Sequence, residues 1–169
     1  TGRAKDLIIR SGHNIDPAVI EACLESHPAV VIAAAVGKPD DYAGELPVVY
    51  VELHAGQSVS ETELRDYAMI NIDERPACPK DVFVLDALPI TTLGKIHKPT
   101  LRSLAAEQSI REYLTDFSVA VGASVLPDGG IEVVVKAKDY KTSLIDFCSD
   151  LSLRLGLKIS VQQATEQYV

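Results

Sequence analysis

Residues 30–53, VVIAAAVGKPDDYAGELPVVYVEL, decide the fold of this chain. Residues 30–36 are an unbroken apolar run of strand length, and residues 47–53 form a second run of the same kind. Between the two runs, residues 37–41 have the glycine, proline and aspartate composition of a loop. We therefore expect two neighbouring strands, joined by a loop, within a small domain of mixed helices and strands.

Two helices are predicted from their capping residues. Asp16 as N-cap and Pro17 at the first helical position predict a helix that runs to about Glu25. Ser60 and Glu63 form a capping box, which predicts the start of a second helix. The apolar stripes are expected to comprise Val19, Ile20, Cys23 and Leu24 in the first helix, and Leu64, Tyr67, Ala68 and Ile72 in the second.

Shorter elements complete this first region, residues 1–103. A strand is expected within residues 6–10 and another at 82–85, each marked by a short apolar run. A loop at residues 89–94 precedes a helix that begins at Lys98 and reaches residue 107 or beyond. The fold class is therefore α+β, with a small sheet flanked by helices.

Residues 104–169 form a second region, an α+β extension with a ββαβ order. The expected elements are strands at 117–125 and 131–137, a helix over 140–155 that ends at Gly156, and a strand at 159–163. The sequence Pro-Asp-Gly-Gly at residues 127–130 is a hairpin signal between the first two strands. The extension has no catalytic constellation, so a structural or interaction role is favoured over a second active site.

The composition disfavours several classes of function. The formal net charge of −8 argues against nonspecific nucleic-acid binding, which needs a basic surface. No apolar run approaches the roughly 20 residues that cross a bilayer, and we expect no signal peptide, so a cytoplasmic location is predicted. The three cysteines are widely spaced without a Cys-x-x-Cys pair, and no metal site is predicted.

Basic side chains gather in two islands of this acidic chain. Arg3, Lys5 and Arg10 lie in the first fifteen residues. Residues 87–103 contain no acidic side chain and hold Lys95, His97, Lys98 and Arg102. Such islands suggest an anion site, and solvated ends of strands and helices account for them equally well.

The second island contains Thr-Thr-Leu-Gly-Lys-Ile at residues 91–96. This segment fails as a P-loop, because the first glycine is absent and Ile96 stands where Ser or Thr would meet Mg²⁺. It leaves Lys95 beside Gly94, which lets the backbone approach a ligand closely. Taken alone, a turn with a solvated lysine is the commoner case. The polar turn Ser-Gly-His-Asn at residues 11–14 either holds an anion or simply connects a strand to a helix.

Several motifs, taken together and in order, resemble a known family. They are GRAKDLI at residues 2–8, SGHNIDP at 11–17 with IE at 20–21, VG at 36–37, GE at 44–45, PVVYV at 47–51, PIT at 89–91, GKI at 94–96, and Lys98. They are similar to the C-terminal domain of adenylate-forming enzymes, the superfamily of acyl-CoA synthetases, adenylation domains and firefly luciferase. The closest resemblance is to fatty-acyl-CoA and other acyl-CoA synthetases, and it covers residues 1–103.

The resemblance implies a two-step ligase. A carboxylate attacks the α-phosphate of ATP, the C-terminal domain then rotates, and a thiol such as that of CoA displaces AMP. Lys95 matches the family's adenylation lysine, Lys5 stands at its hinge position, and Arg3 matches an arginine near the nucleotide. Three residues match the lining of the pantetheine tunnel: Gly12, His13 and Asn14.

The resemblance also implies ligands and partners. The whole enzyme would use ATP, Mg²⁺ and CoA, and this chain would bind none of them tightly, because the family's nucleotide and acyl pockets lie in a large N-terminal domain. We therefore expect a fragment that is inactive alone, whose partners are its own N-terminal domain, a carboxylic acid and CoA. The alternatives are an adenylation domain that loads a carrier protein, or a stand-alone interaction or regulatory module. Homo-oligomerisation through the extension is also predicted.

Overall fold

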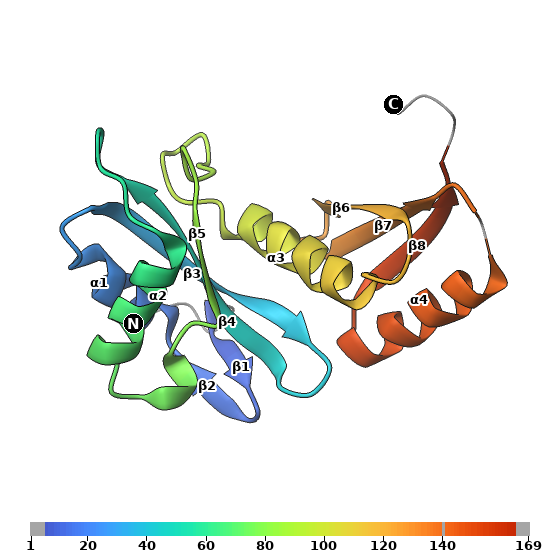
Figure 1. The fold of residues 1–169 in the computed structure, drawn as a ribbon, viewed down its shortest axis with the longest axis horizontal. Coiled ribbons are helices and arrows are strands. Elements are labelled where there is room, and N and C mark those ends of the chain that lie inside the picture. Colours follow the sequence, from blue (N-terminus) through green and yellow to red (C-terminus); the bar gives the residue numbers. More distant parts are fainter. Residues whose placement is uncertain (1–5, 140, 165–169) are drawn as a thin grey trace. The chain divides into compact units, whose positions relative to one another are not determined.

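The computed structural model describes residues 6–139 and 141–164, and the chain divides into two compact units between Leu101 and Arg102. Each unit has its own sheet and its own core (Figure 1). The mixed helices and strands confirm the predicted α+β class. Among the described residues, no helix combines the length and apolarity needed to cross a membrane.

The sheet of the first unit is organised around one central strand. Its strands are β1 (Ile8–Arg10), β2 (His13–Ile15), β3 (Val30–Asp40), β4 (Gly44–Leu53) and β5 (Asp81–Val84). β3 pairs with β4 in antiparallel register from Val30↔Leu53 to Asp40↔Gly44. The other side of β4 is shared: β1 pairs with its first residue, and β5 runs parallel to its second half. Because each side of β4 is used, its central residues 47–51 are buried.

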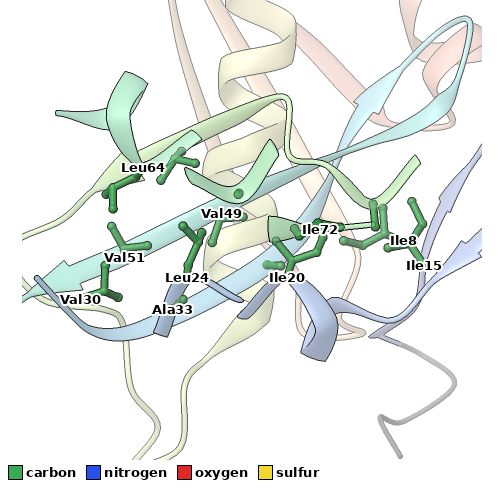
Figure 2. Packing of buried hydrophobic residues seen from close by; sticks show 14 residues of the cluster. Ile8, Ile15, Ile20, Leu24, Val30, Ala33, Val49, Val51, Leu64 and Ile72 are labelled. Carbon is green, nitrogen blue, oxygen red and sulfur yellow. The ribbon is translucent and has the colours of Figure 1, made fainter. Parts of the chain in front are cut away.

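Two helices cover one face of this sheet. They are α1 (Pro17–Glu25) and α2 (Glu61–Asn71), and the short 3-10 helix η2 (Arg75–Ala77) follows α2. Ile20 and Leu24 of α1 and Leu64 of α2 converge on Val49 and Val51 of β4 (Figure 2). On the opposite face of the same strands, Ala34, Val36, Val48 and Tyr50 are also buried. Burial on both faces explains why these strands are continuous apolar runs rather than alternating ones.

The predicted helix caps are confirmed. The Asp16 carboxylate accepts from the Ala18 N–H at 3.0 Å, and the Ser60 hydroxyl accepts from the Glu63 N–H at 3.2 Å. The predicted stripe of α1 is wrong at Val19, whose side chain is 48% exposed. Val19 lies about 100° around the helix from Ile20, which is far enough to leave the apolar face.

The loop predicted at residues 37–41 is wrong, because β3 continues to Asp40. Gly37 lacks a side chain, and the Glu45 carboxyl group occupies the space that a Cβ would need. The same carboxylate accepts from the Ile9 N–H at 2.8 Å, which ties β1 to the hairpin. The actual turn lies at residues 41–43, where Asp40 Oδ1 accepts from two successive backbone N–H groups.

The polar turn predicted at residues 11–14 is shorter than expected. Ser11 and Gly12 have positive φ values of 49° and 83°, so these two residues alone make the turn of a tight hairpin. His13 and Asn14 belong to β2, with Asn14 opposite Ile9. The segment is therefore a hairpin and not a strand-to-helix connection.

The second unit has the predicted ββαβ order, preceded by a helix. Its elements are α3 (Lys98–Tyr113), which begins in the first unit, β6 (Val119–Val125), β7 (Ile131–Ala137), α4 (Thr142–Leu155) and β8 (Lys158–Gln163). β6 and β7 are antiparallel, whereas β7 and β8 are parallel. Gly156 has a φ of +62° and ends α4 as predicted. Ile110 of α3 and Leu144 and Cys148 of α4 share one core, and burial raises the pKa of the Cys148 thiol.

A buried ion pair joins β3 to β5. Lys38 Nζ lies 3.0 Å from Asp81 Oδ2, and their side chains are 3% and 29% exposed. Removing one member of a buried pair leaves a charge in a poorly solvated place.

We predict that Asp81→Asn lowers the free energy of unfolding of the first unit by about 3 kcal/mol. Urea unfolding followed by circular dichroism measures this loss. Asp73→Asn, at an exposed position, is the control and should leave stability unchanged. The double variant Lys38→Met/Asp81→Asn should regain much of the loss, and an Asp81→Asn variant as stable as the original chain would contradict the prediction.

Candidate functional site

Lys95 lies directly after the turn of a small closed hairpin. The His97 N–H donates to the Pro89 carbonyl at 2.7 Å and closes its base. Ile90 and Ile96 form an antiparallel bridge above this bond, and the Thr91 N–H donates to the Lys95 carbonyl at 2.7 Å. We call residues 89–97 the lysine hairpin. The predicted loop is thus a structured element with its own hydrogen bonds.

The backbone around Lys95 depends on Gly94 and Thr91. Gly94 has a φ of +75°, which favours glycine, and its N–H donates to the Thr91 carbonyl at 2.9 Å. The Thr91 hydroxyl accepts from the Lys95 N–H at 3.2 Å. These bonds fix the Lys95 backbone and leave its side chain to extend outward.

The Lys95 ammonium is exposed and has no charged partner among the described residues. Its neighbours at the tip are apolar, with Leu93 85% exposed and Ile90 67% exposed. An unpaired cation beside exposed apolar side chains is suited to enter a site formed by another surface.

The other basic residues of the islands are less available. Lys98 Nζ forms an ion pair with Glu21 Oε1 at 2.7 Å. Arg10 donates to the Pro76 carbonyl at 2.9 Å. Arg3 and Lys5 lie outside the described residues. The second island therefore offers Lys95, and not a cluster of free cations, as its accessible charge.

Gly12 lies in the turn of the β1–β2 hairpin, and His13 and Asn14 follow it in β2. All three are exposed, and the position that a Gly12 Cβ would take has no heavy atom within 4 Å. A side chain there would project into the space beside the tip. Because residue 12 is glycine, no side chain occupies that space.

The two hairpins lie at opposite ends of the first sheet (Figure 1). Arg10 pairs with Gly44, the first residue of β4, whereas the Leu88 N–H, just before the lysine hairpin, donates to Glu52 near the end of β4. Since β4 has ten residues, a strand length of about 30 Å lies between the ends of β4 to which the two hairpins are attached.

Other candidate sites were sought among the residues that the structure describes. They contain no group of three or more potential metal ligands. A pocket of about 120 Å³ between α2 and β5 is smaller than typical small-molecule sites. Its carboxylates have other partners: Glu61 accepts from the Val84 N–H, and Asp81 pairs with Lys38. Burial, and then nearby Cys78, raises the pKa of the Cys23 thiol, so this cysteine is a poor nucleophile.

Comparison with protein families identifies the first unit. Residues 19–95 match the model of the AMP-binding enzyme C-terminal domain. These residues therefore form such a domain. The match confirms the resemblance predicted from the motifs, and it ends at Lys95 of the lysine hairpin.

Curated relatives of this AMP-binding C-terminal domain are named as CoA ligases. Marinolic acid–CoA ligase of a Pseudoalteromonas strain is 49% identical over 127 residues, 72% of this chain. Acetyl-coenzyme A synthetase of Deinococcus radiodurans is 40% identical over 110 residues, 65% of this chain. The chain covers 19% and 17% of these two proteins, so it spans about a fifth of the length of its relatives.

Solved structures show the same fold. ATP-bound MatB from Rhodopseudomonas palustris matches 64% of this chain and 21% of its own, with a TM-score of 0.60 at 30% identity. The o-succinylbenzoate CoA synthetase of Bacillus subtilis, in complex with its acyl-adenylate intermediate, matches 59% of this chain and 20% of its own, with a TM-score of 0.54 at 40% identity.

Two carboxylates at the base of the lysine hairpin were not predicted as part of the site. Glu21 was noted only as part of a motif, and Glu52 was not singled out. The sequence indicates only that each is an acidic residue next to a predicted core element. Their partners come from distant parts of the sequence, which periodicity does not reveal.

We predict that Lys95 reacts with a limiting amount of acetic anhydride before Lys98 and Lys38. Lys95 is exposed and unpaired, Lys98 is ion-paired with Glu21, and Lys38 is buried. Peptide mass spectrometry after digestion measures the order of modification. Exposed Lys80 is the reference and should react at a similar rate to Lys95. Protection of Lys95 relative to Lys80 would show that its ammonium is occupied.

Proposed function

We propose that this chain contains the mobile C-terminal domain of an ATP-dependent carboxylate–CoA ligase. The observation that carries the proposal is the placement of an unpaired lysine and a bare glycine tip at opposite ends of one rigid sheet. The names of the relatives, which are CoA ligases and synthetases, support the same reaction class. Because the chain spans about a fifth of these proteins, the activity belongs to a longer protein.

Lys95 acts in the first step of this proposal. A carboxylate oxygen attacks the α-phosphorus of ATP, the bond to the β-phosphate oxygen breaks, and pyrophosphate leaves. The carboxylate and the phosphate oxygens are anionic, so a cation placed between them lowers the energy of the transition state. The residues present fit this role, because the Lys95 ammonium is exposed and is not neutralised by a carboxylate among the described residues.

The β1–β2 tip acts in the second step. The CoA sulfur attacks the acyl carbon of the adenylate, the carbon–oxygen bond to the phosphate breaks, and AMP leaves. A path for the thin pantetheine arm needs a wall without side chains, and Gly12 provides one. His13 and Asn14 border the same path, since they are the residues of β2 that come directly after Gly12.

Separation of the two tips supports a rotation of the domain between the steps. The two hairpins are attached near opposite ends of β4, a strand of about 30 Å, so a single orientation is not expected to present both Lys95 and Gly12 to one reaction centre. By the resemblance, the rotation occurs at Lys5, with Arg3 close to the nucleotide. ATP, Mg²⁺ and CoA are then ligands of the whole enzyme, and the chain alone is inactive.

The acceptor that the relatives favour is CoA rather than a carrier protein. Their ligase names also favour a ligase domain over a stand-alone regulatory module. A cytoplasmic location and homo-oligomerisation through the extension stay predictions.

We predict that Lys95→Ala in the whole protein lowers adenylate formation by about 100-fold or more, because it removes a charge that stabilises the transition state. Carboxylate-dependent ATP–pyrophosphate exchange measures this step, with a panel of acids from acetate to palmitate. The rate of thioester formation from supplied acyl-adenylate and CoA should stay within about twofold of the unmodified protein's rate, because the proposal assigns the lysine to the first step alone. Lys80→Ala is the matched control, and the 169-residue chain should show no exchange. Equal loss of both half-reactions would contradict the role of Lys95.

We predict the reverse pattern for Gly12→Leu, which should slow thioester formation and spare adenylate formation. Gly12→Ala is the matched control, because both variants strain a backbone with a positive φ and only leucine fills the space beside the tip. Thioester formation from supplied adenylate should therefore be slower in the leucine variant than in the alanine variant. Equal rates in the two variants would remove the tip from the pantetheine path.

A further inference from the structure

The lysine hairpin has two attachments to the rest of the first unit, and both use carboxylates. On its N-terminal side, the Leu88 N–H donates to Glu52 Oε2 at 3.3 Å, and Leu88 is buried. On its C-terminal side, Lys98 pairs with Glu21 at 2.7 Å. The hairpin is therefore held at its base by β4 and by α1.

Glu21 joins three elements through one oxygen atom. Its Oε1 accepts from the Ala35 N–H of β3 at 2.9 Å and from Lys98 Nζ at 2.7 Å. Because Glu21 lies in α1, the carboxylate links this helix to the free edge of β3 and to the start of α3. The Glu21 and Lys98 side chains are each 20% exposed, so solvent screens their attraction less than that of an exposed pair.

The link reaches Lys95 through a short piece of chain. Lys98 follows Lys95 by three residues, a path of at most about 10 Å. His97 lies between them, its Nδ1 is 2.7 Å from the Thr100 hydroxyl, and its N–H closes the hairpin on Pro89. Displacement of Lys98 would therefore be transmitted to the hairpin base.

The position of a lysine ammonium depends on a well-fixed backbone more than that of a group on a shorter side chain does. Its four-carbon stem is flexible, so the direction of the ammonium depends on where the backbone begins. A shift of about 1 Å in a catalytic group costs up to about 100-fold in rate.

We propose that Glu21, acting through Lys98, is a positioning residue for Lys95 in adenylate formation. This inference rests on the proposed function, and it adds that the hairpin is held by an ion pair to α1. The pair contributes to the step that uses Lys95 and not to the step that uses the opposite end of the sheet.

The first measurement uses the 169-residue chain and does not depend on activity. Lys98→Met removes the ion pair and leaves Glu21 able to accept from Ala35. Trypsin cleavage at the Lys95–Ile96 bond, followed by mass spectrometry, is expected to accelerate about tenfold, as local opening of the hairpin base becomes easier. Lys98→Arg should restore slow cleavage at this bond. Glu25→Gln is the matched control, because Glu25 lies on the same helix and accepts from the Ala33 N–H of the same strand edge.

The second measurement uses the whole protein. Lys98→Met is expected to lower ATP–pyrophosphate exchange about tenfold while thioester formation from supplied acyl-adenylate is retained, and Lys98→Arg should recover the exchange. Loss of both half-reactions in proportion would indicate general destabilisation and overturn the positioning role.

The outcomes separate the two proposals. Unchanged cleavage of Lys98→Met overturns the anchoring of the hairpin. Faster cleavage with unaltered exchange, in an enzyme that Lys95→Ala inactivates, overturns the positioning role and leaves the proposed function intact. Unimpaired exchange in Lys95→Ala overturns the proposed function itself, together with the role of Glu21 that rests on it.

Discussion

The pairing of β3 with β4 is the interaction on which the rest of the first unit depends. One side of β4 is filled by β3, and the other side divides between β1 at its start and β5 along its second half. The length of this ladder sets the distance between the tip that carries Gly12 and the hairpin that carries Lys95. A short sheet would bring both groups to one place. A strand of ten residues keeps them apart, and the proposed rotation of the domain rests on this separation.

The edge strand of a sheet has backbone N–H and C=O groups that no other strand pairs with. In both units, side chains of a helix form hydrogen bonds with some of these groups. Glu21 and Glu25 of α1 accept from Ala35 and Ala33 at the edge of β3. In the second unit, Glu107 of α3 accepts from the Ala123 N–H of β6, and Arg111 donates to the Val121 carbonyl at 2.8 Å. Side chains that satisfy an edge also discourage pairing with another chain. In the first unit the same carboxylate has a second use, because Glu21 also holds the base of the lysine hairpin.

The sequence predicted elements better than it predicted their connections. Caps at Asp16, Ser60 and Gly156 were recognisable because each depends on a few adjacent residues. The extension of β3 through residues 37–40 was missed, because local composition indicates a loop. Contacts from distant residues stabilise it as a strand: Glu45 lies against Gly37, and Asp81 neutralises buried Lys38. The candidate site was likewise predictable only where adjacent residues mark it. Lys95 and Gly12 stood out as motif residues, whereas Glu21 and Glu52 acquire their roles only when α1 and β4 are brought beside the hairpin.

Similarity to a named CoA ligase extends from the first unit into the second. The core of the second unit is separate from that of the first unit, with Ile110, Leu144 and Cys148 at its centre. Similarity to the Pseudoalteromonas marinolic acid–CoA ligase nevertheless covers 72% of the chain, which is more than the first unit contains. The aligned region must therefore continue past Leu101. At least the start of the second unit is therefore similar to a protein named as a CoA ligase. The second unit is accordingly best studied together with the domain that it follows.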